Sequence, residues 1–237
     1  MSSQHISLYL TAEHACGYLP DRLAANLVPD PALSMTMPLY SHLIELGYRR
    51  SGLHTYRPHC RLCNACIPCR IPVRQFVPRR KQRRAEQANR DCTIHLTEAG
   101  FNDERFALYS RYLNARHSDG GMVNPQPDDF SNFLYCDWSD TRFLEVRRQN
   151  ELIAVAVCDV VTNGLSAVYS FFNPDERGRS LGTFCVLQLI RQTRQMGLGH
   201  VYLGYLIMES RKMRYKADYR PLDIFRDNRW QLFDEHA

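Results

Sequence analysis

Long apolar runs are absent from this chain of 237 residues. No stretch approaches the roughly 20 consecutive apolar residues that a membrane-spanning helix requires, and no basic segment followed by an apolar one stands at the N-terminus, as in a secretory leader. Internal repeats and low-complexity tracts are absent as well. We therefore expect a globular protein of the cytoplasm that has no membrane partner.

Acidic side chains are missing from residues 46–85, although the chain contains 25 of them. This stretch carries eleven of the 30 basic residues, and its densest part has five cations in six positions (Arg79, Arg80, Lys81, Arg83, Arg84). Such a run is usually a solvated face, but no acidic neighbour in the sequence can neutralise this one. We predict that it contacts the phosphates of a nucleic acid, in binding that salt weakens.

Nine cysteines, an odd number, indicate reduced thiols or metal ligands rather than a disulfide framework. Four of them (Cys60, Cys63, Cys66, Cys69) follow one another at a constant step of three. Thiolates at this spacing can share a tetrahedral zinc, and the run also resembles an iron–sulfur loop, although Pro68 and the short last interval depart from the ferredoxin pattern. Cys16 could replace Cys69 as a ligand. Burial as small apolar side chains and redox sensing remain open alternatives.

The stretch 168–205 has the pattern of a strand, a loop, a helix and a second strand. Val168–Phe172 is a continuous apolar run typical of a buried strand, and Ser180 is placed to cap a helix that begins at Leu181 and ends at Gly197. A helix start that follows a strand presents free N–H groups to an anion. Arg179 adds a guanidinium group, which can donate two parallel hydrogen bonds to a phosphate. The alternative is an ordinary strand–helix–strand unit with a well-capped helix.

Strands are also expected at 142–148, 152–161 and 165–172, because turn signals separate three apolar runs there. A short helix is expected after Pro20-Asp21 through Leu27, a second helix at 37–47, and a strand at 48–56. The composition changes near residue 90. We predict an α+β protein with a small, Cys-rich, basic N-terminal domain (1–90) and a second domain (91–237) in which helices flank a mixed sheet.

Several motifs occur together in one order: Gly47-Tyr-Arg-Arg-Ser-Gly52, Tyr56-Arg-Pro58, the cysteines of 60–68, Gln82-Arg-Arg84, Arg179-Ser-Leu-Gly-Thr183, Tyr202-Leu-Gly-Tyr205 and Lys212-Met-Arg-Tyr-Lys216. Together they resemble the aminoacyl-tRNA–protein transferases along nearly the whole chain. The short length and Cys16-Gly-Tyr-Leu19 look most like the bacterial branch, which transfers leucine from leucyl-tRNA to proteins that begin with Asp or Glu.

The resemblance implies a GNAT-like acyltransferase fold for the second domain, with the loop Arg179, Ser180, Gly182 and Thr183 around the tRNA 3′ end. It implies an activity that needs no cofactor and marks proteins for N-degron degradation, and in some relatives a structural zinc or iron–sulfur site, here on Cys16, Cys60, Cys63 and Cys66. Arginyl transfer, a coenzyme A-dependent N-acetyltransferase with an RNA-binding metal module and a non-catalytic RNA-binding zinc protein are the alternatives.

The implied reaction is attack by a protein α-amine on the ester of an aminoacyl-tRNA, which requires positioning, a modest base and N–H donors for the oxyanion. Candidate catalytic residues lie around the loop after 172 (Tyr169, Asp175, Ser180, Tyr205), although core packing is the alternative for both tyrosines. An acidic acceptor side chain requires a cation, for which the candidates are Arg49, Arg50, Arg57, Lys212 and Lys216.

Overall fold

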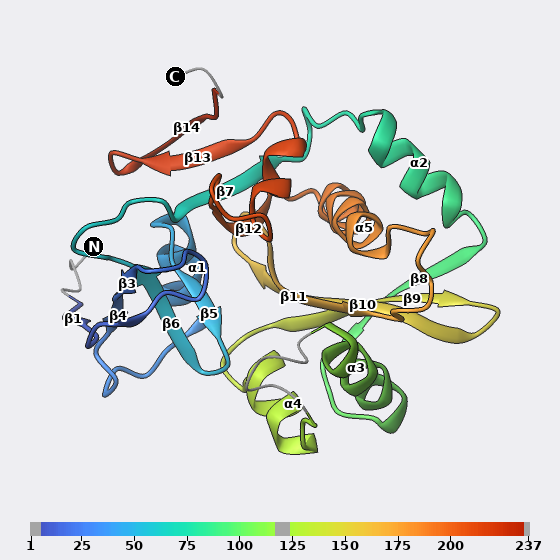
Figure 1. Cartoon of the computed structure of the whole chain (residues 1–237), viewed down its shortest axis with the longest axis horizontal. Coiled ribbons are helices and arrows are strands. Elements are labelled where there is room, and N and C mark those ends of the chain that lie inside the picture. Colours follow the sequence, from blue (N-terminus) through green and yellow to red (C-terminus); the bar gives the residue numbers. More distant parts are fainter. Residues whose placement is uncertain (1–5, 117–123, 235–237) are drawn as a thin grey trace.

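A mixed sheet of eight strands forms the centre of the structure, a computed structural model that describes residues 6–116 and 124–234 (Figure 1). The strand order is β14-β13-β7-β12-β11-β10-β9-β8. Neighbours are antiparallel except for β11 and β12, which are parallel. The strands are β7 (Ile67–Pro72), β8 (Cys92–Glu98), β9 (Thr141–Arg148), β10 (Glu151–Val161), β11 (Gly164–Phe172), β12 (His200–Leu206), β13 (Asp223–Arg226) and β14 (Arg229–Leu232).

Helices cover both faces of this sheet (Figure 1). Helix α5 (Leu181–Gln195) packs on strands β9 to β12 with α2 (Arg80–Ala88) outside it, whereas α3 (Asp103–Arg116) and α4 (Pro127–Leu134) cover the opposite face. Because both faces of the sheet are covered, nearly all residues of β10 are buried, whichever face their side chains point to. The predicted mixed α+β sheet flanked by helices is therefore confirmed. A short 3₁₀ helix, η1 (Arg214–Asp218), follows β12.

The segment before β7 forms smaller sheets beside the large one (Figure 1). One has four strands in the order β1-β4-β6-β5, and the other pairs β2 with β3. Helix α1 (Met37–Glu45) confirms the helix expected at 37–47. The strands are β1 (Leu8–Leu10), β2 (His14–Ala15), β3 (Leu23–Ala24), β4 (Asn26–Pro29), β5 (Arg49–Ser51) and β6 (His54–Pro58).

Two expectations for this region were wrong. Leu23–Ala24 and Asn26–Pro29 are strands where a helix was expected, because Leu27 pairs with Leu10 on one side and Arg57 on the other, and these distant pairings override local helix propensity. The strand expected at 48–56 is a hairpin, in which Gly52 with φ +56° provides the left-handed turn residue between β5 and β6.

Strand β7 precedes residue 90 in the sequence but lies inside the large sheet. It pairs with β12 on one side and β13 on the other. The eight-stranded sheet therefore takes a strand from the segment before the expected boundary, and the division into domains 1–90 and 91–237 stays a prediction.

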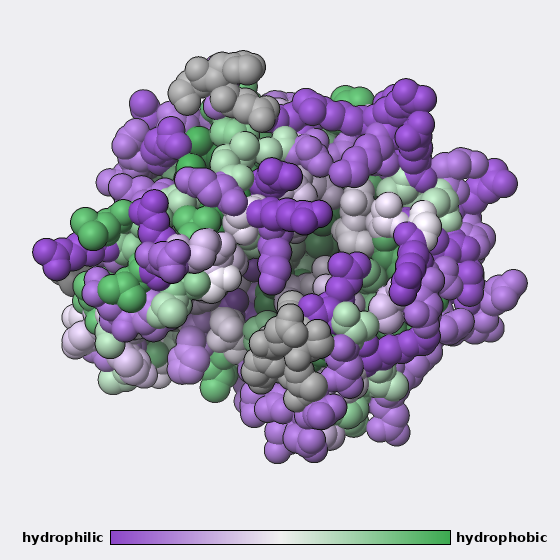
Figure 2. All heavy atoms as spheres, viewed as in Figure 1, coloured by the Kyte–Doolittle hydropathy of each residue, from purple (hydrophilic) through white to green (hydrophobic). Residues whose placement is uncertain are grey.

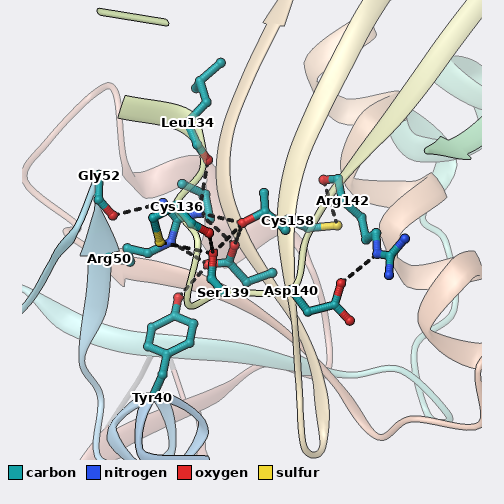
Figure 3. A network of polar contacts seen from close by, with 12 residues as sticks. Tyr40, Arg50, Gly52, Leu134, Cys136, Ser139, Asp140, Arg142 and Cys158 are labelled. Atoms are coloured by element: carbon teal, nitrogen blue, oxygen red, sulfur yellow. Dashed lines mark hydrogen bonds and ion pairs between the residues drawn. The ribbon is translucent and has the colours of Figure 1, made fainter. Parts of the chain in front are cut away.

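A buried ion pair connects the small sheet to the large one (Figure 3). Arg50 on β5 and Asp159 on β10 are fully buried, with Nη2 and Oδ1 2.7 Å apart. The Tyr40 hydroxyl donates to the same carboxylate at 2.7 Å, and that of Thr141 at 2.6 Å. Such a pair is costly to break, because either charge left alone would be buried without compensation.

Candidate active site

The site is built where β11 and β12 separate. These parallel strands pair only over Gly164–Ser166 and His200–Tyr202, although each continues for several residues. We call this space the wedge. Beyond Ser166 the β12-facing edge of β11 presents N–H and C=O groups that have no ladder partner in β12. Val168 also bulges from the β10–β11 ladder, because Val157 pairs with Tyr169 and Cys158 with Ala167. Bulges of this kind re-aim backbone groups and are common beside active sites.

Arg49 extends from β5 into the wedge. Its Nη2 donates to the Val168 carbonyl at 3.3 Å. On the other side the guanidinium lies against Gly204 of β12, where a Cβ atom would come within 2.2 Å of Nη1. Gly204 has φ +77° and lies at a register shift between β12 and β7. A glycine at this position therefore allows both the bulged backbone and the close approach of Arg49.

A cavity of about 550 Å³ opens at the first turn of α5. Its walls come from the end of β11, the start of α2, the end of α3 and η1. Figure 2 shows a hollow near the centre of the face where these elements meet, with hydrophilic side chains around its rim. The lining residues are Arg79, Lys81, Gln82, Tyr112, Arg116, Ser170, Phe172, Gly182, Thr183, Val186, Tyr215, Asp218 and Tyr219.

Two of the predicted phosphate-loop residues, Gly182 and Thr183, line this cavity, but Arg179 is bound elsewhere. Its guanidinium donates to both carboxylate oxygens of Asp91 at 2.7 and 2.9 Å, and to the Ala88 carbonyl at 2.7 Å. A further bond of 2.9 Å reaches Glu176. The hydrogen bonds from Arg179 lower the pKa of Asp91 to about 2. A phosphate would have to replace Asp91 in order to bind Arg179.

Helix α5 begins at Leu181 as expected, but the predicted serine cap is wrong. Ser180 adopts a left-handed conformation, with φ +51°, and its side chain makes no capping hydrogen bond. This left-handed conformation replaces the extended backbone that a serine N-cap typically has. Asp175 is exposed and forms an ion pair with Arg111.

The two candidate tyrosines differ in their hydroxyl groups. Tyr205 is buried, and its hydroxyl donates to the Gly47 and Tyr56 carbonyls at 3.2 and 3.1 Å, which holds β12 against the small sheet. The Tyr169 hydroxyl is shielded from solvent and makes no hydrogen bond within the part of the chain that the structure describes. Burial raises the pKa of both tyrosines, so neither hydroxyl ionises near neutral pH.

The basic run forms the start of α2. Gln82 and Ala85 face the interior, whereas Arg80, Arg83 and Arg84 are exposed. The exposed Lys81 lies 3.5 Å from Asp218. This face stands next to the cavity, because Arg79 and Lys81 belong to both.

The five cations expected to bind an acidic acceptor are not brought together. Arg50 is committed to Asp159 and inaccessible, and Arg57 stacks on the Tyr48 ring and donates to the Leu46 carbonyl at 2.9 Å. Lys212 is exposed. Lys216 is buried, and its Nζ donates to the Tyr205 carbonyl at 2.5 Å. Arg49 and Lys216 are the two that lie near the wedge.

The predicted metal-binding cysteines surround a second cavity, of about 950 Å³, beside the small sheets. Cys16, Cys60, Cys63 and Cys66 line it, whereas Cys69 is buried in the core beside β12. Burial, then the neighbouring cysteines, raise the pKa of Cys66 to about 12. Within residues 6–116 and 124–234 no three His, Cys, Asp or Glu side chains are grouped so that they could hold a metal ion. The metal site on Cys16, Cys60, Cys63 and Cys66 stays a prediction.

Sequence reasoning did not find the wedge, the bulge at Val168 or the aromatic walls of the first cavity. Hydrophobic patterns predict strands but not where neighbouring strands stop pairing. Tyr215 lies within the quoted motif 212–216, so the motif was a signal for the cavity wall.

No helix within the described ranges combines the length and apolar character that crossing a membrane requires.

Comparisons with known proteins agree with the motifs. Residues 14–84 match the model of the arginine-tRNA-protein transferase N terminus, and residues 104–226 match that of its C terminus. An aspartate/glutamate leucyltransferase of Pseudomonas fluorescens is 48% identical over 229 residues, which cover 97% of each chain. One from Pseudomonas putida is 48% identical over 225 residues, or 95% of this chain and 96% of the relative.

Similarity to solved structures is weaker. The structure of L-PGS from Bacillus licheniformis gives a TM-score of 0.43 at 12% identity, with 72% of this chain and 49% of that one covered. The resemblance predicted from the motifs is confirmed by the full-length relatives and the two family matches. The chain belongs to the arginine-tRNA-protein transferase family of aminoacyltransferases.

Proposed function

We propose that this protein transfers leucine from leucyl-tRNA to the N-terminal Asp or Glu of target proteins and so marks them for degradation. The observation that carries the proposal is the similarity over 97% of the chain to a relative named aspartate/glutamate leucyltransferase. The wedge, the adjoining cavity and the basic face of α2 give this reaction a place for each participant.

The cavity at α5 is the site we assign to the 3′ end of the tRNA. Tyr112, Phe172, Tyr215 and Tyr219 provide aromatic surfaces on which a base can stack. Arg116 lies over the Phe172 ring, with 5.5 Å between Cζ and the ring centroid, and it reaches the cavity together with Arg79 and Lys81. These cations meet the phosphates of the terminal nucleotides, and the exposed part of α2 continues the basic surface toward the acceptor stem.

The leucyl ester then reaches the wedge from the cavity, and the acceptor amine attacks its carbonyl carbon. The C–N bond forms first and gives a tetrahedral oxyanion. Its collapse breaks the C–O bond to the tRNA, and the departing ribose oxygen takes up a proton in exchange for the one that the attacking amine loses. N–H groups on the β11 edge beyond Ser166, outside the β11–β12 ladder, stabilise the oxyanion, a contribution worth roughly 3 kcal/mol per donor. This use of splayed parallel strands beside a helix start is the GNAT-like arrangement that we propose for the domain. No cofactor takes part.

A cluster or zinc ion on Cys16, Cys60, Cys63 and Cys66 has no step in this scheme. Thiolates would suit either group chemically, and these four cysteines line one cavity. Metal analysis of the purified protein, by elemental spectroscopy and visible absorbance, tests this separate proposal.

The test of function is transfer of labelled leucine from leucyl-tRNA to peptides that begin with Asp, Glu, Asn or Ala. We expect label on the two acidic peptides alone. Arginyl-tRNA and acetyl-coenzyme A serve as competing donors, because arginyl transfer and N-acetyl transfer are the alternative activities. Transfer from either of these donors with none from leucyl-tRNA would contradict the proposal.

A further inference from the structure

Arg49 and Lys216 are two neighbouring cations that have no acidic partner within the part of the chain that the structure describes. Arg49 is partly buried and bonds to the Val168 carbonyl, and Lys216 is only 4% exposed and bonds to the Tyr205 carbonyl. Among residues 6–116 and 124–234, no carboxylate lies within ion-pair distance of either. Burial lowers the pKa of Lys216 to about 8, and the charge of Arg49 adds to this shift, so the two groups are close enough to repel.

Charges removed from water are normally paired in folded proteins, because desolvation is otherwise uncompensated. This chain follows that rule at Arg50, whose carboxylate partner Asp159 is equally buried, and at Arg105, which pairs with Glu145 at 2.8 Å. Arg49 departs from the rule at the point where β11 and β12 separate. Two cations beside the wedge that lack a counter-charge within the described residues are therefore suited to bind an anion.

We propose that Arg49, with Lys216 behind it, binds the side-chain carboxylate of the acceptor's N-terminal Asp or Glu. This inference rests on the proposed function and assigns its specificity to one side chain. In aspartate the carboxylate is separated from the carbon that bears the α-amine by a single methylene group. The side chain that binds this carboxylate must therefore lie next to the reaction centre. Arg49 lies there, because its guanidinium is hydrogen-bonded to the carbonyl of Val168, the bulged residue of β11.

Charge and shape both contribute to selectivity at such a site. A guanidinium can donate two parallel hydrogen bonds to a carboxylate, whereas the amide of Asn or Gln offers one acceptor and no charge. Gly204 has no side chain and so provides space for the Arg49 guanidinium. Any larger residue at this position would displace the guanidinium. An acceptor that begins with Asn would leave Arg49 buried without a counter-charge, which is the penalty that rejects it.

The experiment compares the full-length protein with Arg49→Met, which keeps a long apolar stem beside Gly204 but removes the charge. Leucine transfer is measured on matched peptides that begin with Asp or Asn, at varied peptide and varied leucyl-tRNA concentrations. We expect the preference for Asp over Asn in kcat/KM to fall at least ~30-fold, with the loss on the Asp peptide. Arg49→Lys should recover part of the preference. Arg191→Met, which removes an exposed cation from α5, is the matched control.

Binding gives a readout that does not depend on turnover. Fluorescence anisotropy of a labelled Asp peptide, competed by unlabelled Asp or Asn peptides, should show discrimination by the wild type and none by Arg49→Met. Unchanged discrimination in a variant that unfolds at the wild-type temperature would overturn the inference. So would a raised KM for leucyl-tRNA alone, which would assign Arg49 to a tRNA phosphate, or an equal loss on every acceptor. If the wild type itself moved no leucine to Asp peptides, the proposed function would have failed instead.

Discussion

Two cations of the same predicted group, Arg50 and Lys216, are buried in opposite electrostatic settings. Arg50 meets Asp159 with two parallel hydrogen bonds and is held by the surrounding hydroxyl groups. Among the described residues, Lys216 meets a carbonyl oxygen, the Met213 sulfur and the Tyr215 ring, but no carboxylate. Burial without an acid partner lowers the pKa of this lysine to about 8, from 10.5. The folded state therefore holds the lysine proton less tightly than the unfolded chain does.

This difference predicts how stability depends on pH. Between about pH 8 and 10.5 the unfolded chain binds more protons at Lys216 than the folded chain, so raising the pH favours folding through this group. Relative to Lys216→Met, the wild type should gain up to ~3 kcal/mol in free energy of unfolding across this window. Urea unfolding of both proteins at several pH values measures it. Lys212→Met, which changes an exposed lysine, should show no such trend, and a pH-independent difference for Lys216→Met would contradict the assignment.

At the level of elements, the sequence predicted best the parts whose signals are local. The meander β9–β10–β11 and helix α5 were predicted because apolar runs and turn residues, such as Asn163-Gly164, lie within a few positions of one another. The segment around Leu27 was predicted wrongly because its structure depends on strands about 17 and 30 residues away. The wedge could not be predicted, because it is an absence of pairing between β11 and β12, which no residue pattern encodes.

Helix α2 was recognised as a basic run, and its geometry now separates exposed charges from structural ones. Arg80 and Arg84 lie one turn apart on its exposed side. Replacing both with Gln should weaken tRNA binding and reduce its salt dependence, by roughly one unit of slope for each phosphate that the protein no longer neutralises. Filter binding at several salt concentrations measures both effects.

The matched control for α2 is the double variant Arg191→Gln/Arg226→Gln, which removes the same charge from exposed positions on α5 and β13. Binding by this control should keep the wild-type slope. Equal effects of the two double variants would mean that net charge, rather than the α2 surface, governs tRNA binding.

At the level of the whole molecule, strand β7 decides how the chain can be divided. It separates β12 from β13, and its neighbourhood contributes Cys69, Ile71, Val73 and Phe76 to the largest hydrophobic core. A fragment of residues 91–237 would leave two strand edges without partners and would expose this core.

We expect fragment 91–237 to lack a cooperative unfolding transition, whereas the full chain unfolds in one step when monitored by circular dichroism. Co-expression with fragment 1–90 should restore a soluble complex, because β7 can then insert between its two neighbours. A fragment 91–237 that folded cooperatively on its own would support the predicted boundary near residue 90 and show that β7 is dispensable.

The short pairing between β11 and β12 also divides the large sheet into two groups of strands that are joined by three residue pairs. Strands β14, β13, β7 and β12 form one leaf, and β11, β10, β9 and β8 form the other, with only Gly164–Ser166 and His200–Tyr202 stitched together. Helix α5 packs on strands of both leaves, namely β12 in the first and β9, β10 and β11 in the second. Its first turn opens into the cavity. Within the described residues this three-residue ladder carries all the strand pairing between the two halves, so the packing of α5 on β9 to β12 must also hold them together.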